Sequence, residues 1–274
     1  MKRILACIPL LFLFSFTVSG QEVQYSFSQD RPLSYAFRME GDIAYYFEGM
    51  PGQEFKVLSK GNITLETVEV AEDFYRVKLT PSKTLMELNS MVLEDITAQD
   101  TARSQMISTV MMDIKRNGEI VNAEEISPGI LNLSQMLMIL PVFPEKTYQG
   151  RKWEQTVPAF SLPGIPLCDL KFTYFYAKES ENAVKIDLLS NHRIREKRSD
   201  GGRDIEFTGL NSSKGGFSFD KKSGGITDFK GVINLVLKAV YRMPPEPGQK
   251  TSRQMPLNMK IKLNVNLSPA DKTD

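Results

Sequence analysis

The sequence predicts a mainly β fold, with one or more large antiparallel curved sheets or a half-barrel and a central apolar helix. The clearest observation lies near the C-terminus, where apolar and polar residues alternate strictly from Leu257 to Leu267. Such alternation places every apolar side chain on one sheet face, and a sheet with one wet face is antiparallel. The other two observations are a pair of similar hairpin patterns and a continuous apolar segment, Ile130–Leu140.

The first twenty residues are expected to be a secretory signal peptide. Lys2 and Arg3 precede an apolar run from Ile4 to Val18, and small residues follow up to Gly20. A membrane-spanning helix needs roughly 20 apolar residues, and this run is shorter and contains a proline, so a membrane anchor is the weaker interpretation. We therefore expect cleavage near Gly20 and a mature protein that is periplasmic or secreted.

Net charge and cysteine content narrow the classes of function. Removal of residues 1–20 lowers Lys plus Arg from 34 to 32 against 33 Asp plus Glu, a formal net charge of −1. This balance gives no electrostatic case for nucleic acid or anionic lipid as a partner. Cys168 is the one cysteine beyond the signal peptide, so an intramolecular disulfide is excluded and packing must hold the fold together.

Two hairpin patterns organise the chain. In Gly216–Phe229, a strand that ends on Asp220 is followed by a basic turn and Gly224. Met111–Val121 follows the same rule around Asn117-Gly118, and Asn-Gly is the strongest short-range hairpin signal. Two similar β halves would explain the repeat, although glycine turns are common and coincidence stays open. The expected units are a first β half at 21–123, a helical connector at 124–149 and a second β half at 150–274.

Strand-like segments fill both halves. The polar residues 21–32 are expected to be an irregular lead-in, and Gly41-Asp42 is expected to interrupt the first strand. Thr84–Ile96 fits a helical stripe as well as a strand, so both interpretations stay open. In chain order the expected strands are 33–39, 43–47, 55–70 in two pieces, 74–79, 106–114, 150–153, 170–176, 184–188, 205–207, 217–219, 231–241 and 257–267.

The segment between the halves predicts the central helix. Ser127-Pro128-Gly129 resembles an N-cap followed by proline in the first turn, and Pro141 would end the helix. Residues 130–140 are apolar almost all round, and such a helix must be buried on more than one side.

This layout resembles the LolA/LolB-like fold of exported proteins. A signal peptide, long one-sided antiparallel strands and a single apolar helix carry the resemblance, which covers residues 33–267 and rests on no residue motif. It implies an open half-barrel over a hydrophobic cavity with helical segments as a lid. No functional residue is transferred, because no motif position matches.

The sequence offers no recognisable catalytic or metal site. His192 is the only histidine and has no partner nucleophile or further ligand at a known spacing. Cys168 lies in an apolar setting without an activating group, which is typical of a buried structural cysteine. We expect no enzyme, no cofactor and no bound metal.

The leading functional hypothesis is a non-enzymatic envelope protein that binds an apolar ligand, such as a lipid, an acyl chain or a lipoprotein segment. The alternative is a structural or interaction module with a dry core, which would imply an envelope protein partner. Under the first hypothesis the ligand lies between the concave sheet face and the central helix. The expected ligand-binding residues are Tyr35, Phe37, Leu133, Met136, Leu137, Leu140, Tyr174 and Tyr176.

Overall fold

The structure, a computed structural model, describes residues 22–88, 91–94, 105–127, 129–131, 137–148, 150–160, 168–200, 203–243 and 253–270. The expected signal peptide lies outside these residues. Within them, no helix combines the length and apolar character that crossing a membrane requires.

The described residues form sixteen β-strands. They are β1 Leu33–Phe47, β2 Gln53–Val70, β3 Phe74–Leu88, β4 Met91–Glu94, β5 Gln105–Ile107, β6 Thr109–Lys115, β7 Ile120–Ser127, β8 Gly129–Leu131, β9 Lys152–Phe160, β10 Cys168–Glu179, β11 Ala183–Leu189, β12 His192–Asp200, β13 Arg203–Asn211, β14 Lys214–Asp220, β15 Gly225–Met243 and β16 Arg253–Pro269.

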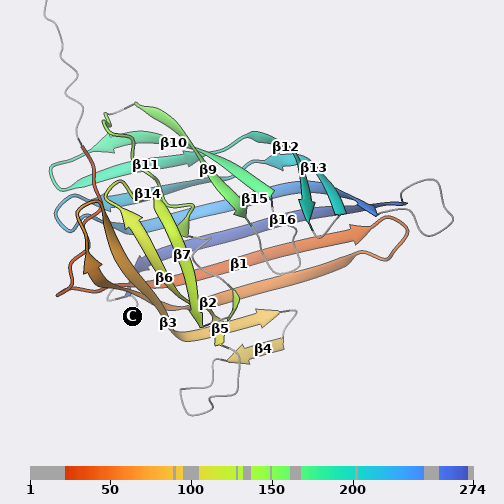
Figure 1. Cartoon of the computed structure of the whole chain (residues 1–274), viewed down its shortest axis with the longest axis horizontal. Helices are drawn as coiled ribbons and strands as arrows, with labels where there is room; N and C mark the ends of the chain where they lie inside the picture. Colours follow the sequence, from red (N-terminus) through yellow and green to blue (C-terminus); the bar gives the residue numbers. More distant parts are fainter. Residues whose placement is uncertain are drawn as a thin grey trace, which may run out of the picture.

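Fourteen of these strands belong to one large, open, antiparallel sheet, which confirms the predicted class (Figure 1). Its strand order is β7-β6-β3-β2-β1-β16-β15-β14-β11-β10-β9, with β13 also pairing β15, β12 pairing β13, and β4 pairing β3. The strands of the first expected half therefore lie on one side of the β1–β16 pair and those of the second half on the other. Figure 1 shows the two ends of this order curving toward each other in front of the central strands. Whether the halves arose by duplication stays a prediction.

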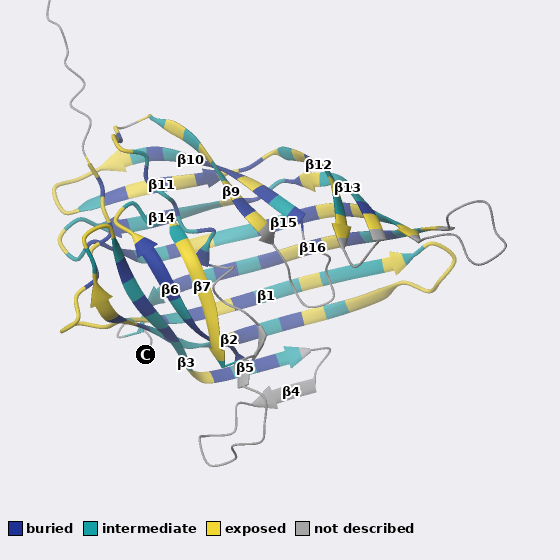
Figure 2. Cartoon of the chain, viewed as in Figure 1, coloured by how far each residue is buried: buried dark blue, intermediate teal, exposed yellow. Residues whose placement is uncertain are grey.

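The sheet buries one face and exposes the other, as the alternating strands predict. Along β16, Leu257 to Leu267 are buried at every second position, while Lys260 and Lys262 between them are exposed. Figure 2 shows the same alternation of buried and exposed positions on the neighbouring strands. We call the buried face the inner face and the other the outer face.

Both predicted hairpins are present. β6 and β7 are joined by the turn at 116–119, and β14 and β15 by the turn at 221–224. Gly118 and Gly224 have positive φ angles of 94° and 63°, which L-residues with a side chain rarely adopt. The Asn117 side chain accepts a hydrogen bond from the Glu119 backbone nitrogen, and Asp220 accepts one from Ser223.

The expected irregular lead-in is instead an extended segment, which we call the strap (residues 22–27). Val23, Tyr25 and Phe27 alternate with exposed residues and are buried in the core. The Tyr25 nitrogen donates to the Arg116 carbonyl at 2.7 Å, and the Ser26 nitrogen donates to the Gly224 carbonyl at 2.9 Å. The strap therefore joins the turns of the two predicted hairpins.

The predicted central helix is not supported. Ile130 and Leu131 belong to strand β8, which pairs in parallel with β5, and Ser127 ends strand β7. Leu137 has a helical backbone, residues 138–140 form a turn and a bend, and residues 132–136 lie outside the described residues. Parallel pairing with β5 therefore satisfies backbone groups of β8 that the sequence pattern assigned to a helix. The pattern was ambiguous, because a short apolar run suits a buried strand as well as a helix.

The predicted break at Gly41-Asp42 is also wrong, because β1 runs continuously through it. A Cβ atom at Gly41 would lie 1.8 Å from the Lys262 carbonyl oxygen on β16. The glycine permits a close approach of two strands instead of ending one. At 84–96, the strand interpretation is confirmed for residues 84–88 and 91–94, which belong to β3 and β4.

Candidate functional site

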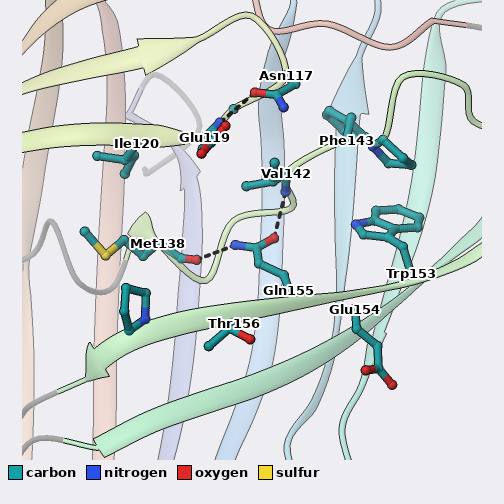
Figure 3. Close-up of a pocket in the computed structure, with 13 residues that line it drawn as sticks. Asn117, Glu119, Ile120, Met138, Val142, Phe143, Trp153, Glu154, Gln155 and Thr156 are labelled. Carbon is teal, nitrogen blue, oxygen red and sulfur yellow. Dashed lines mark hydrogen bonds between the residues drawn. The ribbon is translucent and has the colours of Figure 1, made fainter.

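A short irregular stretch connects the two ends of the sheet, and we call it the seam segment (Leu137–Phe143). The Gln155 side chain on β9 holds one side of it (Figure 3). The Gln155 amide donates to the carbonyls of Met138 at 2.7 Å and Leu140 at 3.1 Å, and its oxygen accepts from the Val142 nitrogen at 2.8 Å. One side chain thus satisfies three backbone groups that belong to no strand pair.

The other side of the seam segment contacts the β6–β7 hairpin and the core. The Phe143 nitrogen donates to the Asn117 carbonyl at 2.8 Å. From inside the core, the Tyr174 hydroxyl donates to the Ile139 carbonyl at 2.6 Å, and the Tyr25 hydroxyl donates to the Pro141 carbonyl at 3.0 Å. The segment therefore bridges the gap between β9 and the β6–β7 hairpin, where no direct strand pairing occurs.

A cavity of about 450 Å³ opens beside this bridge, and we call it the seam pocket. Its walls come from three places, namely the β6–β7 turn, the seam segment with Pro144, and β9 (Figure 3). The residues that line it are Asn117, Gly118, Glu119, Ile120, Met138, Val142, Phe143, Pro144, Trp153, Glu154, Gln155, Thr156 and Pro158.

The lining of the seam pocket combines an apolar surface with acidic groups. Ile120, Met138, Phe143 and Trp153 supply large apolar side chains. Glu119 is the acid on the hairpin side, where Lys115 pairs with it at 2.8 Å from outside the pocket. The described lining contains no Lys, Arg or His. An apolar molecule without negative charge suits these walls, because Lys115 offsets only Glu119 and an anion would still meet the second lining acid, Glu154.

Trp153, the one tryptophan of the chain, occupies the junction between the pocket and the core. Its ring stacks on Tyr174 at a centroid distance of 5.6 Å and lies 6.3 Å from the Phe143 ring. Its indole nitrogen is buried and has no hydrogen-bond partner. An unpaired buried donor of this kind lowers the free energy of unfolding by roughly 1–3 kcal/mol.

Most of the predicted ligand-binding residues lie deeper than the pocket. The side chains of Tyr35, Phe37, Tyr174 and Tyr176 are buried on the inner face, and Tyr174 and Tyr176 have no exposed surface. Of the seam residues, Leu137 is buried and Leu140 is partly buried against the same core, while Leu133 and Met136 lie outside the described residues. None of the six described residues lines the seam pocket, and ligand contact by them stays a prediction.

The protein's own aromatic rings fill the interior around those residues. Tyr25 of the strap packs against Phe143 at 5.5 Å and against Phe219 at 5.3 Å, and Tyr174 packs against Phe217 at 6.1 Å. Burial raises the pKa of Tyr25 and Tyr174 well above the ordinary value of a tyrosine. The strap and seam segment therefore make this part of the inner face a packed core.

The structure describes the surroundings of Cys168 and His192, the two residues considered for catalysis. Cys168 is buried, and burial raises the pKa of its thiol to about 12, which keeps it protonated at neutral pH. His192 Nε2 lies 2.7 Å from the Thr173 hydroxyl, with no carboxylate in this contact. Among the residues that the structure describes, no group of three or more His, Cys, Asp and Glu side chains could hold a metal ion.

Sequence patterns did not identify the pocket residues as a group. Asn117-Gly118 was recognised only as a turn, and the prolines after residue 140 only as the end of a helix. Trp153 and Gln155 lie on the same face of β9, two residues apart, and that spacing was the one available signal. The seam segment brings β9 and the β6–β7 hairpin together through tertiary contacts, and local periodicity carries no information about such contacts.

Comparisons with known proteins give little further information. No protein-family model and no curated protein matches the chain. Among solved structures, the chain is similar to a structure described as "Lipid-protein interactions in lipovitellin", with a TM-score of 0.42 and 12% sequence identity. The match covers 91% of this chain but 27% of the other. A likeness at this level carries no argument about function. The resemblance to LolA/LolB-like proteins receives no support from these comparisons.

Proposed function

We propose that the protein is a non-enzymatic exported binding protein whose seam pocket takes an apolar ligand with an uncharged or cationic head. The carrying observation is the pocket itself. It has about 450 Å³ of space, it is lined by Ile120, Met138, Phe143 and Trp153, and it lies where the sheet edges are bridged only by an irregular segment. Small-molecule sites typically occupy about 300–1,000 Å³ and are predominantly apolar with a few polar groups.

The surroundings of the pocket favour a ligand that enters from the gap and stops at the core. Phe143 and Trp153 form the inner wall, and behind them the rings of Tyr25, Phe219 and Tyr174 are already packed. An acyl chain or a comparable hydrocarbon group would cover the apolar wall. The pocket lining holds two acids, Glu119 and Glu154, and Lys115 pairs only with the first, so the lining disfavours a fatty-acid anion and tolerates a neutral glycerol or amine head.

One observation favours the alternative of a structural module with a dry core. Tyr174 and Tyr176 have no exposed surface on the inner face, and the seam segment contacts the Tyr174 hydroxyl. A protein that only needed a stable sheet for binding another envelope protein would pack in the same way. The two functions differ in one respect, since the module requires no ligand in the seam pocket.

Trp153 provides a direct test, because it is the one tryptophan and lines the pocket. The titrant is a neutral monoacylglycerol with bromine atoms in its acyl chain, which quenches an indole on contact. Saturable quenching of Trp153 fluorescence is expected, with weaker quenching by the corresponding brominated fatty-acid anion. Absence of quenching by the neutral lipid would reject the pocket and leave the dry module.

Two variants on neighbouring residues control this measurement. Ile120→Phe places extra volume in the pocket and should reduce the affinity for the monoacylglycerol. Val121→Phe adds the same kind of side chain to the next position, which is 49% exposed and outside the pocket lining, and should leave the affinity unchanged. Equal loss of affinity in both variants would argue against binding at this site.

Export and the absence of enzyme activity belong to the same proposal. A signal peptide that ends at Gly20 would leave Gln21 as the first residue of the mature chain, directly before the strap. The intact mass of the protein, purified from the host that produces it, checks this expectation. A mass that includes residues 1–20 would count against it.

A further inference from the structure

The outer face carries a surface in which cations and apolar side chains alternate across five strands. One row of register partners runs from Arg193 on β12 through Leu210 and Val236 to Lys260 and Ala44. The next row, two residues along each strand, runs from Arg195 through Thr208 and Lys238 to Asn258 and Tyr46. We call these ten residues the outer patch. Each row crosses four strand spacings, about 19 Å at about 4.8 Å per spacing.

Most of the outer patch is open to solvent. Arg193, Arg195, Lys238 and Lys260 are all exposed. Val236 is 45% exposed, Tyr46 is 42% exposed and Leu210 is 37% exposed, although large apolar side chains on a sheet are usually directed inward. Figure 1 shows β12, β13, β15, β16 and β1 side by side along the central sheet, so the rows form one continuous surface.

The four cations of the outer patch have no acidic partner among the described residues. No ion pair is formed by Arg193, Arg195, Lys238 or Lys260 within the described part of the chain. The neighbouring acid on β13, Glu206, already faces Arg242 at 3.3 Å and Lys197 at 3.9 Å.

The adjoining row of residues on the outer face does not cancel the positive charge of the outer patch. Asp42 is the register partner of both Lys262 and Lys56, so that row also holds more positive than negative groups. Beyond the end of the first row, Glu54 on β2 is the register partner of Ala44, so the excess of positive charge lies over β12 to β16. The net charge of about −1 expected for the mature chain conceals this local excess, and the sequence-based exclusion of anionic lipid as a partner does not apply to this surface.

We propose that the outer patch docks the protein onto a membrane surface that carries anionic lipid headgroups. The charges complement such a surface, where each nearby Lys or Arg contributes about fivefold to binding. Leu210, Val236 and Tyr46 lie between the cations, and apolar and aromatic groups in that position enter the boundary between headgroups and acyl chains. An acidic soluble protein would use the cations but gain less from three exposed apolar side chains. The inference does not depend on a ligand in the seam pocket.

Vesicle flotation tests the proposal with the full mature chain. Vesicles of phosphatidylcholine mixed with phosphatidylserine should bind the protein, and vesicles of phosphatidylcholine alone should bind it much less. Raising the salt from about 0.1 M to about 0.5 M should weaken binding, because the screening length falls below about 10 Å. The double variant Arg193→Gln with Lys260→Gln should bind the anionic vesicles about 25-fold more weakly.

A matched pair of lysines provides the control. Lys146 and Lys185 are exposed, form no ion pair in the described residues and lie outside the outer patch. The double variant Lys146→Gln with Lys185→Gln removes the same charge and should keep its binding. Val236→Ser should weaken binding at fixed charge, which tests the apolar contribution. Equal loss in both double variants, no preference for anionic vesicles, or binding to polyglutamate but not to vesicles would each overturn the proposal.

Discussion

At the scale of single residues, two glycines set the contact between the strap and the hairpins. A Cβ atom at Gly224 would lie 2.6 Å from the Ser26 nitrogen, and one at Gly118 would lie 2.3 Å from the Tyr25 ring. Both glycines also have positive φ angles. The hairpin pattern therefore repeats for two reasons, because each glycine both completes a turn and leaves room for the strap.

Gly224→Ala separates these two reasons when it is compared with Gly150→Ala. Gly150 also has a positive φ, 83°, but a Cβ there would meet nothing within 4 Å. We expect Gly150→Ala to lower the free energy of unfolding by about 1–2 kcal/mol, from backbone strain alone. Gly224→Ala should lower it by about 2–5 kcal/mol, because overpacking against Ser26 adds about 1–3 kcal/mol. Chemical denaturation measures both, and equal losses would mean that strap contact adds nothing.

At the scale of elements, the seam segment replaces the strand pairing that would otherwise connect β9 to the β6–β7 hairpin. Gln155 supplies the hydrogen bonds on one side, and the carbonyl of Asn117 accepts one on the other. This arrangement leaves an irregular backbone at the sheet edge. The seam pocket exists because that backbone does not fill the gap as a paired strand would.

The elements differ in how far the sequence predicts them. Alternation over residues 257–267 and the Asn117-Gly118 turn predicted β16 and a hairpin correctly, because both signals are local. The helix predicted for Ile130–Leu140 is not supported, since apolar content without a clear period fits a strand as well as a helix. The strap was missed because Val23, Tyr25 and Phe27 alternate in a segment that pairs with turns and not with a strand. Pocket residues such as Trp153 meet their neighbours only through this tertiary arrangement.

Gln155→Leu tests the seam segment as an element. The substitution keeps a similar volume but removes the acceptor for the Val142 nitrogen and the donors to the carbonyls of Met138 and Leu140. We expect a loss of about 1–3 kcal/mol in the free energy of unfolding, because backbone groups lose their partners. Amide hydrogen exchange at Val142 should accelerate. Thr156→Ala, on the exposed face of the same strand, should leave both quantities nearly unchanged, and an unchanged Val142 rate in Gln155→Leu would contradict the assigned role.

At the scale of the whole molecule, the strap connects the two halves of the sheet away from their β1–β16 pairing. Its backbone contacts the β6–β7 turn of the first half at Arg116 and the β14–β15 turn of the second half at Gly224. Between them, the Tyr25 ring packs on Phe143 and Phe219, and its hydroxyl bonds the seam segment at Pro141. Strap, hairpins and seam segment thus form one packed unit that keeps the curved sheet edges together.

If this unit is cooperative, Tyr25→Ala should loosen both hairpins at once. Removal of the buried ring should lower the free energy of unfolding by about 3–5 kcal/mol, and Tyr25→Phe, which loses only the bond to Pro141, by about 1 kcal/mol. Tyr148→Ala, at a tyrosine that is 40% exposed, should cost less than about 1 kcal/mol. Hydrogen exchange in Tyr25→Ala should accelerate together at the amides of Gly118 and Gly224, which bond Lys115 and Asp220 in the native turns. Acceleration in one turn only would show that the strap belongs to a single half, and that the edges of the sheet open independently.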